Sequence, residues 1–214
     1  MVDEITAHAI HDEASLRGHF GATSPLAVAK AHTRLDRNDR AFIARTPFLT
    51  IGTQGADGRA DVSPRGDPPG FVKVLDDATI AIPDRPGNNR LDTMTNILAN
   101  PAVGLLFMVP GFDDTLRING RARLTTAPSL LATMAMRGRT PTLAIVVAID
   151  EIFLHCAKAF RRSKLWDPAS RQDRSELPSL TAIIMEQTEG QKPDEARIAE
   201  ADERLEAAYV ERLY

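Results

Sequence analysis

The sequence predicts an α+β fold in which an antiparallel sheet closes into a small barrel surrounded by helices. Six or seven short β-rich segments lie between positions 48 and 154, and most are joined by tight turns. Helical patterns occupy both ends and one crossover, and they do not alternate with every strand. The chain has 214 residues, 43% of them hydrophobic and 26% charged, which is enough to build a core without disulfides.

The first 45 residues are predicted to form a helical arm. Three short helices fit the pattern, over 12–20, 24–31 and 36–45. Asp12 and Asp36 stand at helix starts, where a carboxylate accepts hydrogen bonds from N–H groups of the first turn. Polar residues interrupt each helix, so each is expected to pack only one narrow face on a larger body.

The pattern changes from helix to strand near position 47. Strands are predicted over 48–53, 59–63, 71–75, 79–83, 103–109, 115–125 and 143–154. The pair Asp57–Gly58 separates the first two strands and predicts a hairpin turn. The segment Pro64–Gly70 is predicted to be irregular, because proline and glycine occupy five of its seven positions.

Further helices complete the predicted arrangement. They are expected over 89–99, 127–136, 157–166, 180–187 and 194–212. The chain is therefore divided into a helical arm (1–45), a barrel domain (46–166) and a C-terminal helical extension (167–214). We expect the extension to pack on the same domain or on a dimer mate.

Charge and composition exclude several classes of protein. The net charge of −3 argues against a nucleic-acid binder, which usually carries a basic excess. Cys156 is the only cysteine, so no internal disulfide or cysteine-rich zinc site can form. Residues 1–5 do not resemble a signal peptide, and the longest apolar run, 143–149, is too short for a membrane span. We expect a protein of the reducing cytoplasm that binds no membrane.

Familiar catalytic motifs are missing from the sequence. It contains neither a G-x-G-x-x-G dinucleotide fingerprint after a strand nor a phosphate-binding P-loop. It has no G-x-S-x-G nucleophile elbow and no H-E-x-x-H zinc motif. The five histidines show no metal-binding spacing in the β region. We therefore assign no catalytic residue and no metal ligand.

A polar segment between a predicted strand and the helix over 89–99 is the first candidate site. Asn88 and Asn89 stand at the helix start, where free N–H groups favour an anion such as phosphate. Arg85 and Arg90 add bidentate donors. In the alternative interpretation an asparagine caps the helix and both arginines pair with neighbouring aspartates.

A second candidate lies where the strand over 59–63 leaves the sheet. Ser63 offers a hydroxyl and Arg65 a guanidinium at this point, which together could form the rim of a ligand site. The alternative is an exposed edge loop in which Arg65 pairs with Asp67.

A third candidate is the cationic segment 155–166. Lys158, Arg161 and Arg162 are spaced to share one helical face. Trp166 follows Arg162 by four positions, where its ring could lie against a guanidinium or a planar ligand. A nucleic-acid patch and a solvated helix face are the alternatives, and Cys156 is expected to be a packed thiol, not a nucleophile.

Taken together, these segments resemble the pyridoxamine 5′-phosphate oxidase-like FMN-binding split-barrel superfamily. The resemblance is strongest to its branch of FMN-dependent oxidoreductases with uncharacterised substrates. It covers about 40–166, and extends more loosely to 190. It rests on the order and spacing of segments 56–67, 88–90, 96–107, 115–122 and 156–166.

This resemblance implies a homodimer with one FMN in each of two clefts between the subunits. Asn88, Asn89 and Arg90 would then meet the FMN phosphate. Asp84 and Arg85 would lie beside the ribityl chain and the phosphate.

The resemblance also assigns the two other candidate segments. Ser63 and Arg65 would border the flavin, largely through backbone atoms. The segment from Lys158 to Trp166 would approach from the partner subunit. Within it, Lys158 or Arg161 would stabilise the negative charge of the reduced ring.

Departures from the oxidase pattern bear on the substrate. The oxidase branch ends in an Arg-Leu pair and a proline that help to hold pyridoxal phosphate, whereas 206–214 has a helical pattern here. The tyrosine that grips the substrate phosphate is replaced around 131–133. We therefore expect an FMN-dependent oxidoreductase that acts on a small molecule other than pyridoxamine phosphate.

The electron donor would be a reduced nicotinamide or a deazaflavin. Two other functions stay open. One is a haem-binding split-barrel protein, for which His155 is the candidate ligand. The other is a cofactor-free interaction protein that uses the apolar stripe of Ile198, Leu205, Tyr209 and Leu213.

Overall fold

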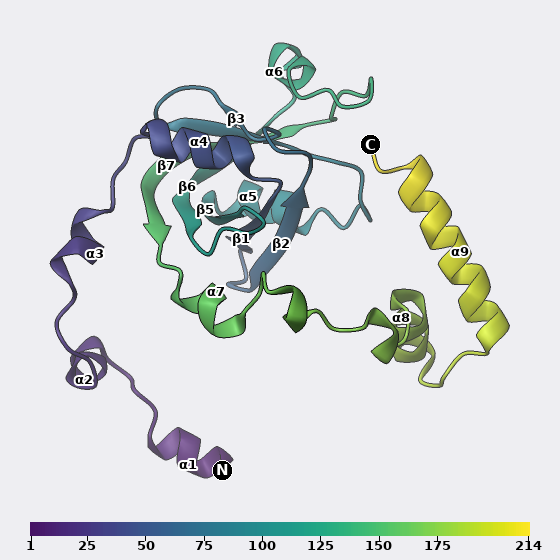
Figure 1. The fold of residues 1–214 in the computed structure, drawn as a ribbon, viewed down its shortest axis with the longest axis horizontal. Coiled ribbons are helices and arrows are strands. Elements are labelled where there is room, and N and C mark those ends of the chain that lie inside the picture. The colour runs from purple at the N-terminus through teal and green to yellow at the C-terminus, as the bar shows by residue number, and fades with distance from the viewer. The chain divides into compact units, whose positions relative to one another are not determined.

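A seven-stranded antiparallel sheet forms the centre of the computed structural model, which describes residues 1–214 (Figure 1). Its strands are β1 (Phe48–Gln54), β2 (Ala60–Gly66), β3 (Lys73–Val74), β4 (Thr79–Pro83), β5 (Ala102–Met108), β6 (Thr115–Thr125) and β7 (Ala144–His155). They are ordered β2-β1-β5-β6-β7-β4-β3. The predicted α+β class is confirmed, but β2 and β3 form opposite edges, so backbone hydrogen bonds do not close the sheet.

The chain divides into two compact units, Met1–His32 and Thr33–Tyr214. The first unit holds α1 (Val2–Ala7), α2 (Glu13–Gly18) and α3 (Pro25–Ala29), and none of these helices has a buried residue. Asp12 caps α2 as predicted, by accepting a hydrogen bond from the Ser15 N–H at 2.7 Å. The sequence predicts domain boundaries at 45 and 166, and these boundaries stay a prediction.

The second unit contains the sheet and the other helices. These are α4 (Arg37–Arg45), α5 (Asp92–Ala99), α6 (Pro128–Ala132), α7 (Lys158–Ser163), α8 (Leu180–Glu189) and α9 (Glu195–Glu211), with short 3₁₀ helices at Pro168–Ser170 and Arg174–Glu176. Asp36 caps α4 in a reciprocal capping box with Asp39, which anchors the helix that covers one end of the core. Every helix is too short or too polar to cross a lipid bilayer.

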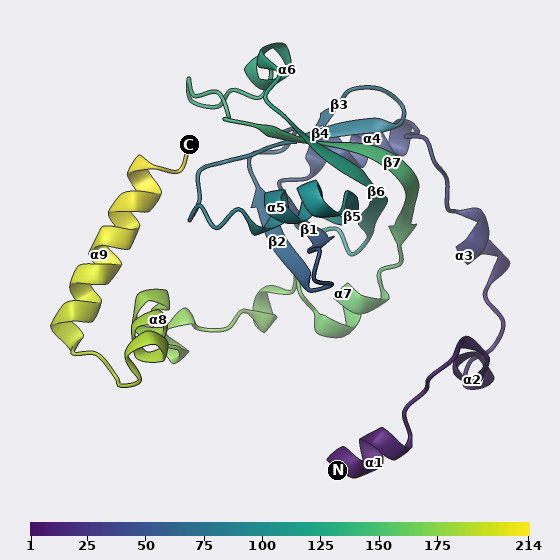
Figure 2. The same cartoon turned by 180° about the vertical axis from the view of Figure 1, so that it is seen from behind.

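Alternate residues of the central strands build the core. Leu49 and Ile51 of β1 and Leu105 and Phe107 of β5 are almost fully buried, and Ile43 of α4 packs into the same cluster. The intervening residues of β1 and β5 are only partly buried, as expected for a sheet with one face on the core. Figure 2 shows α5 beside β1 and β2, where it begins close to the edge of the sheet.

A second, smaller cluster covers the other face of β4 and β7. It consists of Ala81, Leu131, Met134, Ala144 and Val146. Burial on both faces explains why β4 and the first half of β7 read as continuous apolar runs rather than alternating ones. This cluster fixes α6 and the loop after it against the end of β4.

Strand β2 extends beyond its predicted end. It continues through Pro64, Arg65 and Gly66, which the sequence predicted to be irregular, and Pro64 lies opposite Thr50 of β1. Proline is tolerated here because β2 is an edge strand, with a partner on one side only. As residues two apart in a strand, Ser63 and Arg65 therefore point to the same face.

Helix α5 begins later than predicted, at Asp92 and not at Asn89. Asn89 and Leu91 have φ angles of 58° and 59°, in the left-handed region that non-glycine residues seldom adopt. Leu91 is the N-cap residue, and no side chain caps the helix. The predicted helix start at Asn89 is thus wrong, the alternative of an asparagine cap fails as well, and the chain after Pro83 forms a loop before the helix.

Candidate functional site

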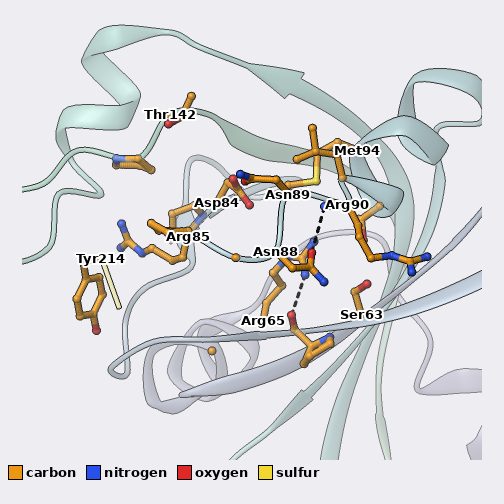
Figure 3. Close-up of a pocket in the computed structure, with 18 of the residues that line it drawn as sticks. Ser63, Arg65, Asp84, Arg85, Asn88, Asn89, Arg90, Met94, Thr142 and Tyr214 are labelled. Carbon is orange, nitrogen blue, oxygen red and sulfur yellow. Dashed lines mark hydrogen bonds between the residues drawn. The ribbon is translucent and has the colours of Figure 1, made fainter. Parts of the chain in front are cut away.

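A cavity of about 720 Å³ opens between β2, the loop after β4 and the segment 139–142 (Figure 3). This volume lies within the range of roughly 300–1,000 Å³ that is usual for small-molecule sites. Its wall contains seven residues predicted for the site: Ser63, Arg65, Asp84, Arg85, Asn88, Asn89 and Arg90. Residues at the ends of β2 and β4 line this cavity together, although the two strands are not neighbours in the sheet.

The cavity wall carries an excess of positive charge. Four arginines line it (Arg65, Arg85, Arg90, Arg139), against two aspartates (Asp84, Asp92). The chain as a whole carries a net charge of −3, so the cavity departs in sign from the rest of the molecule. A concave wall with a net excess of one charge sign favours a ligand of the opposite sign. The cavity is therefore suited to an anion.

Arg65 has an unsatisfied donor at the cavity wall. Its Nε is buried and has no hydrogen-bond partner, while its Nη1 donates to the Pro64 carbonyl oxygen at 2.8 Å. Burial lowers the pKa of Arg65, and the carboxylates of Asp84 and Asp61 oppose that shift. Leaving a buried donor unpaired costs about 1–3 kcal/mol. A ligand acceptor in the cavity would remove this cost, so the residue fits a bound polar group.

Asp84 shares the cavity with Arg65. It directly follows β4, and its N–H donates to the Leu143 carbonyl oxygen at 3.0 Å, which fixes the start of the loop. Burial raises the pKa of the Asp84 carboxyl, and the charge of Arg65 partly opposes this. A carboxylate in this position repels an anionic ligand less when it is protonated.

Arg85 forms a buried ion pair with Asp67. Its Nε and Nη2 each lie 2.7 Å from Asp67 Oδ2, and Nη2 also donates to the Met134 carbonyl oxygen at 2.9 Å. The Asp67 side chain is only 1% exposed. Asp67 is therefore the partner of Arg85, and the alternative pairs expected from the sequence, Arg65–Asp67 and Arg85–Asp84, are wrong. Arg85 anchors the loop to the chain after α6.

Arg90 lies at the opposite end of the cavity from Tyr214 (Figure 3). Its Nε is 2.8 Å from Asp92 Oδ2 in an exposed ion pair, and this hydrogen bond raises the pKa of Arg90. Its backbone N–H donates to Asn88 Oδ1 at 3.1 Å, which folds the loop on itself. The surface pair with Asp92 anticipated as an alternative is thus present, and a bound anion would compete with Asp92 for this guanidinium.

Asp61 organises the wall and was missed in the sequence. Its Oδ2 accepts hydrogen bonds from Ser63 Oγ at 3.1 Å, Thr93 Oγ1 at 3.2 Å and Thr53 Oγ1 at 3.4 Å. These contacts tie β2 to β1 and to the first turn of α5, and they orient Ser63. Only the alternation of Asp61, Ser63 and Arg65 along one strand face could have indicated this role.

The cationic segment 155–166 does not line this cavity within one chain. Arg161 Nε pairs with Asp113 Oδ2 at 3.2 Å. The ring of Trp166 stacks on Phe160, with centroids 5.7 Å apart, and its Nε1 donates to the Phe112 carbonyl oxygen at 2.7 Å. The predicted stacking of Trp166 on an arginine is therefore wrong. It stays a prediction that this segment, with Lys158, Arg161 and Trp166, reaches the site of a partner subunit.

Two further expectations for this segment are resolved by the structure. Cys156 is exposed and not packed as expected, because it lies between the end of β7 and α7. His155 lies beside Phe153, with ring centroids 5.0 Å apart, and it does not line the cavity. A haem in this cavity would thus have no histidine ligand from the same chain.

Comparisons with known proteins agree with the resemblance seen in the sequence. The model of the family described as pyridoxamine 5′-phosphate oxidase matches residues 35–156, which include β1 to β7. No curated protein matches the chain.

Solved structures with a similar chain trace are distant in sequence. HupZ from Group A Streptococcus is 17% identical over 56% of this chain and 93% of its own, with a TM-score of 0.47. General Stress Protein 26 from Bacillus anthracis is 16% identical over 54% of this chain and 88% of its own, with a TM-score of 0.42. The FAD binding protein from Mycobacterium smegmatis is 17% identical over 58% of this chain and 97% of its own, with a TM-score of 0.41.

Proposed function

The chain belongs to the pyridoxamine 5′-phosphate oxidase family, and from this premise we propose that it is an FMN-dependent oxidoreductase whose cavity binds FMN. The observation that carries the proposal is the buried, unpaired Nε of Arg65 on the wall of an arginine-rich cavity. FMN combines a phosphate, a polar ribityl chain and a ring system rich in acceptor atoms, so it can satisfy this donor and this charge.

The residues around the cavity would divide between two ends of the ligand. Ser63 and Arg65 on β2 would border the flavin ring, with Arg65 donating its Nε–H to a ring acceptor. Asn88, Asn89 and Arg90 would meet the phosphate, with the Arg90 guanidinium as its charged partner.

Two other groups of the loop would position the ribityl chain. Asp84 lines the same cavity, and Arg85 holds the loop in place through its ion pair with Asp67. When bound, FMN supplies the transfer of electrons between a donor and a substrate. The protein contributes binding, orientation and charge, which is consistent with a sequence that has no catalytic triad or metal motif.

We further propose that the protein acts as a homodimer. Lys158, Arg161 and Trp166 lie outside their own chain's cavity, so their expected contacts to the flavin need a second copy. A cation supplied in this way would stabilise negative charge near the N1–C2=O edge of the ring. The donor would be a reduced nicotinamide or a deazaflavin, and the substrate a small molecule.

The visible absorption spectrum of the purified protein tests the proposed cofactor. We expect flavin bands, with FMN released on denaturation. A colourless protein that gains no protein-bound flavin signal when FMN is added would contradict the proposal and favour the cofactor-free interaction protein. A Soret band on addition of haem, without flavin binding, would favour the haem-binding alternative. With pyridoxamine 5′-phosphate we expect negligible turnover, because the tyrosine that grips the substrate phosphate in the oxidase branch is replaced around 131–133.

A further inference from the structure

Tyr214 closes one end of the cavity although it lies far along the chain from the rest of the wall. It follows α9, no residue of which is buried. Its hydroxyl donates to Asp67 Oδ1 at 2.8 Å, across 147 positions of sequence. The other oxygen of this carboxylate accepts from Arg85 at 2.7 Å. Asp67 thus connects the ion pair that anchors the loop to the ring of Tyr214.

Two guanidinium groups lie near the ring of Tyr214. The Cζ atom of Arg85 is 5.5 Å from the ring centroid, and that of Arg137 is 5.1 Å away. Both distances are within the range in which a cation is attracted to an aromatic face. Arg139 completes the surroundings, because its Nη1 donates to the main-chain carbonyl oxygen of Tyr214.

The arginines after α6 are presented by a tight hairpin. Met136 and Arg139 exchange two backbone hydrogen bonds of 2.9 Å, and the residues between them, Arg137 and Gly138, have φ angles of 50° and 77°. Two successive left-handed residues are typical of a hairpin turn with primed geometry. This turn holds Arg137 and Arg139 beside Tyr214 without help from the helix that precedes Tyr214.

These contacts are of three kinds that a protein uses to bind an aromatic small molecule. Asp67 accepts a hydrogen bond, Arg85 and Arg137 lie against an aromatic ring, and Arg139 donates to an oxygen at the far end of the occupant. Arg137 and Arg139 are exposed, so the site can be entered from solvent. Only Tyr214 occupies it, on a segment that follows a helix without buried residues.

We propose that Asp67, Arg85, Arg137 and Arg139 form a subsite for a hydroxylated aromatic acid, and that Tyr214 is its displaceable internal occupant. A phenol would replace the Tyr214 hydroxyl at Asp67, and a carboxylate would replace its carbonyl oxygen at Arg139. The subsite adjoins the cavity assigned to FMN, so the ligand would be a substrate of the flavin. This assignment as a substrate rests on the proposed function. Binding to the subsite does not depend on flavin.

The compound 3-(4-hydroxyphenyl)propionate is a suitable probe, because it reproduces the ring, the hydroxyl and the carbonyl end of a tyrosine. Its affinity is measured by calorimetric titration of flavin-free protein. Tyr214→Ala should bind the probe about 10- to 100-fold more tightly than the original chain, because a competitor that fills the site 90–99% of the time is removed. Tyr209→Ala is the matched control on the exposed side of α9 and should leave the affinity unchanged.

Two further titrations test the assigned contacts in the Tyr214→Ala background. The analogue 3-phenylpropionate lacks the hydroxyl and should bind on the order of tenfold more weakly, because Asp67 Oδ1 then has no hydroxyl donor. Adding Arg137→Gln should weaken binding of both compounds. Equal probe affinity in the original chain and in Tyr214→Ala, or no preference for the hydroxylated compound, would overturn the subsite. Failure of FMN to bind, with probe binding intact, would overturn the proposed function alone.

Discussion

Arg65 has a buried donor without a partner on the wall of the cavity. Its Nε is buried without a partner, although its backbone lies in a regular edge strand. Such a group costs stability in the free protein and is a feature of sites in which binding, not folding, selects the residue.

Arg65→Met should therefore separate stability from binding. The thermal unfolding temperature of the flavin-free variant should stay the same or rise, since an apolar side chain of similar length removes the unpaired donor. Its affinity for FMN should fall about 10- to 150-fold, equivalent to the 1.5–3 kcal/mol of a charge-assisted hydrogen bond. A variant that is destabilised but binds FMN normally would show that Arg65 serves the fold.

The ionisation of Asp84 is expected to make both the stability of the folded protein and its affinity for an anion fall as the pH rises. Burial raises the pKa of its carboxyl, so the folded protein releases this proton at a higher pH than the unfolded chain does. The stability contributed by this group is present below the ordinary pKa of 3.8 and is lost as the pH rises through the raised value. Over the same interval the ionised carboxylate begins to repel an anionic ligand.

Asp84→Asn should bind FMN more tightly than the original chain once the pH lies above the raised pKa. The ratio of the two affinities should approach one in acid and increase with pH. Taking the ratio at each pH cancels the titration of the FMN phosphate itself. A ratio that does not change with pH would mean that Asp84 is not close enough to the phosphate for its charge to affect binding.

At the scale of elements, the loop between β4 and α5 is expected to act as a phosphate clamp. Its arginine, Arg90, already pairs with Asp92 on the surface, so a bound phosphate must replace one exposed ion pair with another contact. Exposed pairs of this kind are worth about 0–1 kcal/mol, which leaves most of the gain from a phosphate contact intact.

Arg90→Ala should weaken FMN binding on the order of tenfold and hardly change the binding of riboflavin, which has no phosphate. Arg59→Ala is a matched control, since Arg59 forms a similar surface pair with Asp57 at 3.0 Å outside the cavity. Equilibrium titrations that follow flavin fluorescence measure both ligands. An equal loss for FMN and riboflavin would make Arg90 a structural residue.

Elements defined by local signals were predictable from the sequence. The capped helix α4, the strand β4 and the long strand β6 match their expected ranges closely. The end of β2 and the start of α5 were not predictable, because Pro64 is allowed only by its edge position and Leu91 adopts a left-handed conformation. Helix α1 was not predicted, because it has no side-chain cap to mark its start.

The candidate site was predictable to a similar extent. Segments 63–65 and 84–90 were identified because their residue types suit an anion. The contacts that organise them join distant positions: Asp61 with Thr93, Asp67 with Arg85, and Tyr214 with Asp67. No local pattern marks such pairs, since they arise only when the sheet and the C-terminal segment come together.

In the assembled protein, two chains are expected to complete one site. If Arg90 comes from one subunit and Lys158 from the other, Arg90→Glu and Lys158→Glu should each abolish tight FMN binding when alone. After unfolding and refolding together, the mixture should recover about a quarter of the sites, because half of the dimers would be mixed and each would hold one unaltered site.

Size measurements accompany this mixing experiment. FMN should also raise the unfolding temperature and favour the dimer, because a ligand that binds only the assembled site stabilises it by mass action. A monomer that binds FMN with full affinity, or a mixture that recovers no binding, would show that one chain forms the site.

A crystal structure of the protein with FMN tests the central claim most directly. FMN is expected in the cavity between β2 and the loop before α5, with a flavin acceptor atom within about 3 Å of Arg65 Nε and the phosphate at Asn88, Asn89 and Arg90. FMN bound elsewhere on the protein, or bound in this cavity with Arg65 Nε still unpaired, would contradict it.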